Sequence, residues 1–209
     1  MAKRRDPLAP QPPPAPSRSD SSEIVEAIIT ATIELGDPDA SMNHIARRAG
    51  VGVASVYRYF PNKGAIYAEI SRRMQRDYLD RVRRLLERSD LSMQEAVEAC
   101  CRAALVVPGA SPELRRALNL AVPFSWSQDN AREVFTETIA EFTKWLAARL
   151  TPPPPDLAER VFAAFAAGRG LVMVSRVLPD LAPDDEALVK HMVNIALACL
   201  MPRRSPRGG

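Results

Sequence analysis

The sequence of 209 residues predicts an all-α fold with about nine helices. Apolar residues recur every three or four positions through most of the chain, and no segment shows the apolar–polar alternation of a half-buried strand. Prolines, glycines and capping residues lie between the periodic segments, where helices are expected to begin and end. The hydrophobic share of 46% and the charged share of 25% are those of an ordinary globular protein.

Three helices are predicted near the N-terminus. The apolar face of the first consists of Ile24, Ile28, Ala31 and Leu35. This helix starts at a pair of serines that can cap it and stops at the Gly-Asp-Pro breaker of residues 36–38. The second helix, over residues 42–49, follows Ser41 as N-cap and ends at Gly50, because glycine adopts a left-handed turn at little cost. The third runs over residues 53–60.

Six further helices are predicted, and all but one of the breaks between them contain proline, which cannot continue a helix. They cover residues 63–88, 91–107, 112–121, 127–150, 157–178 and 184–201. Residues 1–20 contain six closely spaced prolines and are predicted to form a disordered arm with a basic tip. Residues 202–209 are predicted to form a frayed basic tail.

The basic residues are concentrated in one part of the chain. Residues 41–88 contain 11 lysines and arginines against 4 acidic residues, whereas residues 89–201 contain 10 against 14. A basic block followed by an acidic remainder is typical of a polyanion-binding module attached to a second functional part. Charge alone leaves open a second interpretation, in which the arginines form an ordinary solvent-exposed helix face without a polyanionic partner.

Residues 41–60 have the pattern of a helix-turn-helix, in which two short helices meet at a tight glycine turn. The residues predicted to be buried against the first helix are Ile45, Ala46, Val51, Val56 and Phe60. The outer side of the second of these helices then presents two tyrosines and an arginine. Such side chains need a partner, and the base edges and phosphates of a DNA major groove supply one.

The matching residues Ile45-Ala46, Ala49-Gly50-Val51, Ser55, Val56-Tyr57, Tyr59-Phe60, Asn62-Lys63 and Ile66 carry a resemblance to a known family. Through them, residues 22–70 resemble the DNA-binding domain of the tetracycline-repressor (TetR) family. The motif covers about a quarter of the chain, and the remainder matches only by length and helix number. The resemblance implies an all-helical homodimer that binds a double-stranded DNA operator and releases it when a small molecule binds the C-terminal domain.

The resemblance also divides the chain by function. It implies a helix-turn-helix DNA-binding domain at residues 21–68 and a ligand-binding and dimerisation domain at residues 69–201. Repression is the expected activity. A transcriptional activator of the same fold and a non-specific architectural DNA-binding protein remain the alternatives, the latter expected to bind every duplex alike.

Individual DNA contacts follow from the same resemblance. Tyr57 and Tyr59 resemble the family's DNA-contacting aromatics, and Lys63 its phosphate-contacting lysine. Val53 is apolar, so it can read only thymine methyl groups or DNA shape, and hydrogen-bonded readout is left mainly to Arg58 and Tyr57. The full set of predicted DNA contacts is Ser41, Asn43, His44, Gly52, Val53, Ser55, Tyr57, Arg58, Tyr59 and Lys63. His44 has an alternative interpretation as an exposed histidine without a role.

Aromatic residues gather in the second half of the chain and suggest an apolar ligand pocket with few polar groups. The residues predicted to line it are Phe124, Trp126, Phe142, Trp145, Phe165 and Arg169. The effector is unknown, and a small apolar or amphipathic molecule is expected. Because aromatics at helical spacing are more often ordinary core residues, a packed core without a cavity is the alternative.

The last predicted helix is apolar almost all round, so it has to be buried on both sides. Its own domain can cover one side, and a symmetric partner is expected to cover the other in a four-helix interface. Small residues in the helix of residues 157–178 allow a close approach of backbones. The residues predicted for the dimer interface are Phe162, Leu188, Met192 and Ile195.

Other classes of protein find no support in the sequence. No nucleophile, base and orienting residue occur at a readable spacing, so we expect no enzyme and no cofactor. The three cysteines, Cys100, Cys101 and Cys199, and the two histidines lack metal-ligand spacing, and the cysteines are expected to be small buried residues. With no membrane-length apolar stretch and no secretory signal, a cytoplasmic location is expected.

Overall fold

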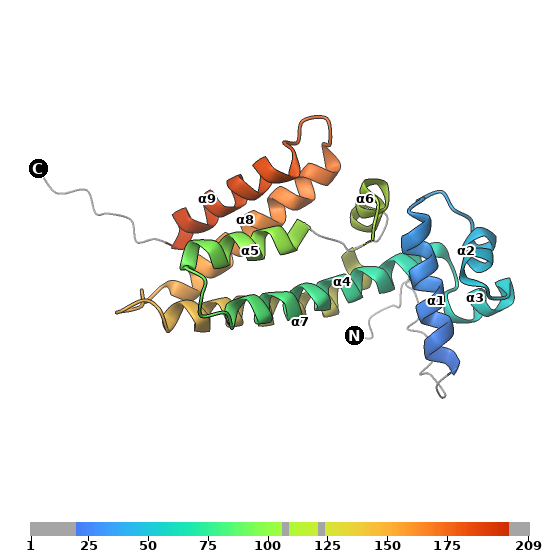
Figure 1. Ribbon diagram of the computed structural model, residues 1–209, viewed down its shortest axis with the longest axis horizontal. Helices are drawn as coiled ribbons and strands as arrows, with labels where there is room; N and C mark the ends of the chain where they lie inside the picture. The colour runs from blue at the N-terminus through green and yellow to red at the C-terminus, as the bar shows by residue number, and fades with distance from the viewer. Residues whose placement is uncertain (1–19, 106–108, 121–123, 201–209) are drawn as a thin grey trace, which may run out of the picture. The chain divides into compact units, whose positions relative to one another are not determined.

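The computed structural model describes residues 20–105, 109–120 and 124–200, and this part of the chain contains nine α-helices and no strand (Figure 1). The helices are α1 (Asp20–Leu35), α2 (Met42–Ala49), α3 (Val53–Tyr59), α4 (Lys63–Leu86), α5 (Met93–Leu105), α6 (Pro112–Leu120), α7 (Phe124–Ala147), α8 (Leu157–Val177) and α9 (Asp185–Leu200). The predicted all-α fold is confirmed. The predicted arm, apart from its last residue, and the predicted basic tail lie outside the described residues.

Contacts divide the chain into two compact units, each considered by itself below. Unit 1 comprises the described residues within 1–74 and 107–130, and unit 2 those within 75–106 and 131–209. The helices α4 and α7 each contribute residues to both units. Unit 1 therefore includes α6 as well as α1 to α3, a grouping by contact that differs from the predicted functional boundary after residue 68.

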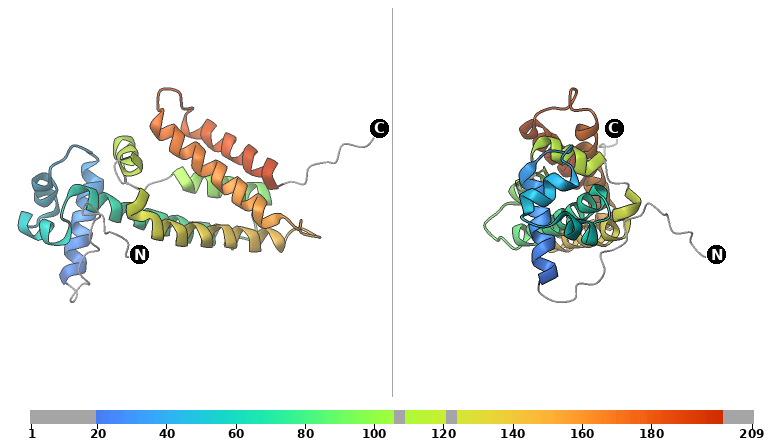
Figure 2. Two further views of the ribbon diagram at one scale, coloured as in Figure 1. Left: turned by 180° about the vertical axis from the view of Figure 1, so that it is seen from behind. Right: turned by 90° about the vertical axis from the view of Figure 1, so that its right-hand side faces the viewer.

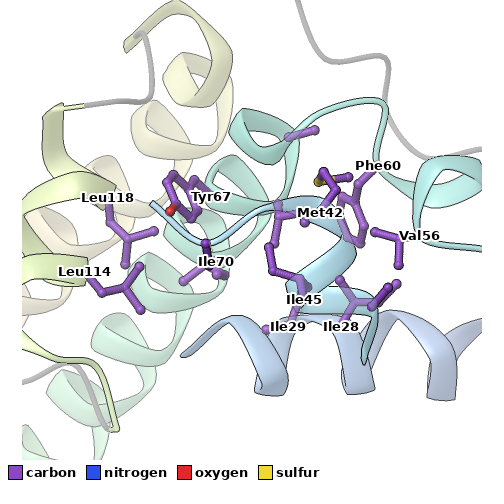
Figure 3. Packing of buried hydrophobic residues seen from close by; sticks show 14 residues of the cluster. Ile28, Ile29, Met42, Ile45, Val56, Phe60, Tyr67, Ile70, Leu114 and Leu118 are labelled. Atoms are coloured by element: carbon purple, nitrogen blue, oxygen red, sulfur yellow. The ribbon is translucent and has the colours of Figure 1, made fainter. Parts of the chain in front are cut away.

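The core of unit 1 is made by apolar side chains from α1 to α4 and from α6 (Figure 3). Its largest members include Ile28, Ile45, Val56, Phe60, Ile66, Ile70 and Leu114, all of which are at most 2% exposed. Full burial of one such side chain contributes roughly 1.5–3 kcal/mol. The residues predicted to be buried in the helix-turn-helix are in this core, with Val51 and Leu35 partly buried against it.

The turn between α2 and α3 depends on Gly50, which has a φ of 67°. Its N–H group donates to the carbonyl oxygens of Ala46 and Arg47, and the N–H of Val51 donates to Ala46 at 3.1 Å. These bonds satisfy carbonyls that the end of α2 would otherwise leave free. The predicted glycine turn is confirmed, and it sets the direction in which α3 leaves α2.

Unit 2 is built from α5, α8 and α9 with the later parts of α4 and α7. The α8 and α9 helices lie side by side, and α5 packs against α9 (Figures 1 and 2). Arg83 of α4 joins α4 to α7, with Nη2 2.7 Å from Glu137 Oε2 and Nε 3.1 Å from Glu141 Oε1. These groups are part-exposed, so solvent screens the ion pairs and the apolar core provides most of the stability.

Substituting Gly50 tests the turn. No other atom lies within 4 Å of the place that a Cβ would occupy at this position, so a side chain would meet no neighbour and only backbone strain is added. We expect Gly50→Ala to lower the free energy of unfolding by about 1 kcal/mol, and Gly50→Asn to lower it less, because asparagine tolerates the left-handed region. Urea unfolding of the two variants measures this. Equal stability of Gly50→Ala and the wild type would contradict the assigned role.

Candidate nucleic-acid interface and apolar cavity

The start of α2 places three predicted DNA contacts, Ser41, Asn43 and His44, at the surface. The Ser41 hydroxyl accepts a hydrogen bond from the N–H of His44 at 3.2 Å, which is the predicted N-cap. The side chains of Asn43 and His44 remain exposed. This end of α2 therefore offers amide and imidazole groups, together with N–H groups of the first helical turn, to an anion such as a DNA phosphate.

The α3 helix has one buried and one exposed face. Val56 is completely buried, and Phe60 directly after the helix is 2% exposed. Around the rest of the helix, Val53 is 40% and Tyr57 53% exposed, and Arg58 is exposed as well. The buried residues fix α3 in the core of unit 1. Its exposed tyrosine and valine can then contact base edges in a major groove.

Arg58 and Tyr59 form a local pair at the end of α3. The Arg58 guanidinium lies 5.0 Å from the centre of the Tyr59 ring, and Nη2 donates a hydrogen bond to the Tyr59 hydroxyl at 3.2 Å. Stacking of this kind holds a long side chain in fewer conformations. Ser55 and Tyr59 are half-buried, whereas Gly52 at the N-cap of α3 is exposed.

Lys63 has a partner within the protein. Its ammonium group donates to the carbonyl oxygen of Pro38, which also accepts a hydrogen bond from the Tyr67 hydroxyl at 3.2 Å. Asn62 caps α4 by accepting from the N–H of Ala65 at 2.9 Å. The lysine predicted to clamp a phosphate thus holds the loop between α1 and α2 in the structure without DNA. A phosphate contact requires it to exchange or share that bond.

Arg47 in the last turn of α2 is a candidate that the sequence reasoning missed. It is exposed and makes no ion pair with any residue in the described part of the chain. Its neighbour Arg48 instead bonds to Glu34 of α1, with Nη2 2.6 Å from Oε2. The signal that could have identified Arg47 is its position in the basic block, on the helix that precedes α3.

Unit 2 contains a cavity of about 70 Å³, several times the 10–15 Å³ that one water molecule requires. Its walls come from α4, α5, α7, α8 and α9. The lining residues that carry polar or aromatic groups are Tyr78, Cys100, Cys101, Phe142, Phe165 and Arg169, and the others are aliphatic or glycine. An apolar space with few polar groups is what small-molecule sites have in common.

The titratable groups of the cavity respond to burial. Burial raises the pKa of the Cys100 thiol to about 12 and that of Cys101 to about 11, so both remain protonated at neutral pH. Burial also raises the pKa of Tyr78 and lowers the pKa of the Arg169 guanidinium. At neutral pH the cavity therefore contains neutral thiols, a neutral phenol and one cation.

The predicted pocket residues have three different placements. Phe142, Phe165 and Arg169 line the cavity. Trp145 is 7% exposed and belongs to the apolar core of unit 2. Trp126 belongs to unit 1, where its ring lies 2.9 Å from the position of a Cβ added to Gly64. The side chain of Phe124 is outside the described part of the structure.

The predicted interface residues are similarly divided. Phe162 of α8 is 60% exposed, whereas Leu188 and Met192 of α9 are 2% and 5% exposed and pack inside their own protomer. Ile195 is half-buried. Further exposed apolar side chains on α8 and the segment after it are Met173, Val174, Val177, Leu178 and Leu181. The helix that was expected to face a partner therefore uses much of its apolar surface internally, and α8 carries the exposed apolar stripe.

Metal-ligating side chains do not gather in the described residues, which contain no group of three or more histidine, cysteine, aspartate or glutamate side chains that could hold a metal ion. None of the helices in these ranges is long and apolar enough to cross a membrane.

A helix-turn-helix with an exposed α3, combined with a helical unit that contains an apolar cavity, defines a DNA-binding regulator. Residues 24–70 match the family model described as bacterial regulatory proteins, tetR family. The resemblance to TetR-family regulators that the sequence motif indicated is thereby confirmed for the helix-turn-helix segment.

Solved structures share the fold. A TetR-family transcriptional regulator from Streptomyces coelicolor is 26% identical, over 86% of this chain and 97% of its own, with a TM-score of 0.55. The fatty acid degradation regulator FadR from Bacillus halodurans is 19% identical, over 90% and 100%, with a TM-score of 0.61. SmeT, the repressor of the Stenotrophomonas maltophilia multidrug efflux pump SmeDEF, is 18% identical, over 91% and 97%, with a TM-score of 0.58. The comparison with curated proteins gives no match.

The two faces of α3 predict opposite effects for neighbouring substitutions. Val56→Ala removes two buried methyl groups and should lower the free energy of unfolding by about 2 kcal/mol. Tyr57→Ala removes an exposed ring and should change it by less than about 0.5 kcal/mol while weakening DNA binding. Chemical unfolding and a duplex-binding assay on both variants measure the contrast. A large loss of stability in Tyr57→Ala would mean that this ring is structural.

Proposed function

We propose that this regulator is a repressor that binds a near-palindromic DNA operator as a homodimer and leaves it when a small apolar or amphipathic molecule enters unit 2. The observation that carries the proposal is the exposed outer face of α3 above the fully buried Val56. Repression is also the activity named for SmeT, a protein of the same fold. Such a regulator acts where the chromosome is, so a cytoplasmic location belongs to the proposal.

The proposed contacts with DNA divide by chemistry. Tyr57 and Arg58 are the side chains that hydrogen-bond to base edges, and Val53 meets thymine methyl groups. Phosphate contacts come from the start of α2, from Gly52 and Ser55 at the start of α3, and from Lys63. To this set we add Arg47, because it is exposed and has no acidic partner in the described ranges. Affinity that depends on phosphates in this way should fall steeply with salt.

The proposed dimer places one α3 from each protomer in successive major grooves, about one helical turn apart. Exposed apolar side chains on α8, with Phe162 at 60% exposure, support α8 as the main contributor to the interface. Ile195 of α9 is half-buried and can join it. Leu188 and Met192 act from within the protomer by supporting α9.

The proposed release of the operator depends on α4, a single helix of 24 residues. Its first turns carry Lys63 and Tyr67 of unit 1, and Tyr78 further along lines the cavity of unit 2. A ligand that displaces Tyr78 acts on the same helix that follows α3. To change operator occupancy from 99:1 to 1:99, it must bind the released state about ten-thousandfold more tightly.

Operator selection from random duplexes tests sequence-specific binding. We expect the wild-type protein to enrich a near-palindrome, and the double variant Tyr57→Ala/Arg58→Ala to lose that enrichment because the base-reading groups are gone. Arg132→Ala removes one exposed arginine of α7 and serves as the charge-matched control, which should enrich the same sequence.

Equal binding to every duplex would contradict the proposal of a sequence-specific regulator and favour a non-specific architectural DNA-binding protein. An enriched sequence that persists in the double variant would mean that other residues read the bases. Once an operator is known, transcription from a promoter that contains it distinguishes repression from activation.

The state of association tests the dimer. We expect sedimentation velocity at micromolar concentration to give a dimer for the wild type and a monomer for Phe162→Glu, because a carboxylate would be buried without a partner. Ala140→Glu, which adds the same charge to an exposed position of α7, should remain dimeric. A wild-type monomer, or a Phe162→Glu dimer of unchanged affinity, would contradict the proposed interface.

A further inference from the structure

The cavity of unit 2 has an unbalanced charge. Of the described residues that line it, Arg169 is the only one with a formal charge at neutral pH, since the thiols and the phenol are neutral. The remaining walls are apolar. A cation beside apolar walls loses part of its hydration, which an anionic group in the cavity would compensate.

Arg169 has an aromatic contact but no acidic one. Its guanidinium carbon lies 4.9 Å from the centre of the Phe135 ring. Within the described part of the chain it makes no ion pair, and loss of solvent is the main influence on the pKa of its guanidinium. Some arginines of unit 2 do bond to carboxylates, such as Arg83 to Glu137 and Glu141, and Arg160 to Asp156. Arg169 differs from these two in that it lines the cavity.

The environment of Arg169 is that of a group at the wall of an open cavity. The residue is exposed, yet partial loss of solvent lowers the pKa of its guanidinium. A side chain combines exposure with a lowered pKa when protein covers part of it and solvent reaches the rest. Tyr78 adds a hydroxyl group that can donate a second hydrogen bond into the same space.

We propose that the effector is an amphiphile with an apolar body and a carboxylate head, and that Arg169 and Tyr78 bind the head. The inference rests on the proposed function, because it assumes that the cavity of unit 2 is the effector site. A carboxylate supplies the missing charge and accepts two parallel bonds from a guanidinium. The apolar body then contacts Phe142, Phe165 and the aliphatic walls. A cationic amphiphile would be repelled, and a neutral one would leave Arg169 uncompensated.

Three probes with the same chain and different heads test this directly: octanoate, 1-octanol and octylamine. Calorimetric titration of the wild-type protein should give a dissociation constant for octanoate that is about ten- to a hundredfold lower than for 1-octanol, the range expected for hydrogen bonds to a charged group. Octylamine should bind more weakly than 1-octanol.

Substitutions then test whether Arg169 causes the preference for octanoate over 1-octanol. Arg169→Met keeps the length of the side chain and should make octanoate and 1-octanol bind equally, with 1-octanol little changed. Arg169→Lys keeps the charge and should retain part of the preference. Arg149→Met is the matched control, because this arginine also stacks on an aromatic ring, 4.1 Å from the Trp145 centre, but does not line the cavity. Circular dichroism confirms that each variant is folded.

The outcomes separate this inference from the proposed function. Octanoate binding that is no tighter than that of 1-octanol, or undetectable, overturns the inference, and so does a preference that survives in Arg169→Met. If octanoate binds through Arg169 but leaves the protein on its operator, the carboxylate site stands and ligand-driven release fails. If 1-octanol binds the cavity as well as octanoate and releases the operator, the proposed function stands and the carboxylate preference fails.

Discussion

The complete burial of Val56 and Phe60 is the constraint on which the DNA-binding surface depends. These side chains are packed in one core with Ile28 of α1 and Ile45 of α2, so α3 cannot rotate without exposing apolar surface. Gly50 sets the angle at which α3 leaves α2. With the inner face held in this way, the tyrosine and arginine on the outer face are presented in a defined orientation, as recognition of base edges requires.

In unit 2, packed helices also fix the positions of side chains, but here they surround a cavity. Its helices are joined by an apolar core and by ion pairs such as those of Arg83 with the carboxylates of α7. Within this frame the packing leaves a cavity, and the one cation on its wall has no acidic partner in the described residues. This arrangement places a charge where a ligand can supply the counter-ion.

Helical periodicity and turn chemistry made the candidate DNA interface predictable, whereas contacts between distant residues did not follow from them. Val56 and Tyr57 are adjacent, and their opposite burial follows from the 3.6-residue repeat alone. Lys63 was assigned to DNA by its position in the motif, but its bond to the carbonyl of Pro38, 25 residues earlier, is visible only in the folded chain. In the same way, Phe165 and Trp145 look alike in sequence, and only one of them lines the cavity.

The helical class, the glycine turn, the basic block and the TetR-type DNA-binding motif follow from local spacing and residue type, so they can be recognised before the chain is folded. Which apolar residues are internal and which remain at the surface depends on the packing of distant helices. Leu188 and Met192 lie on a largely apolar helix and pack within their own protomer, while further exposed apolar side chains lie on α8. Tertiary structure also decided that Tyr78, Cys101 and Arg169 share one cavity, because helices far apart in the chain bring them together only after folding.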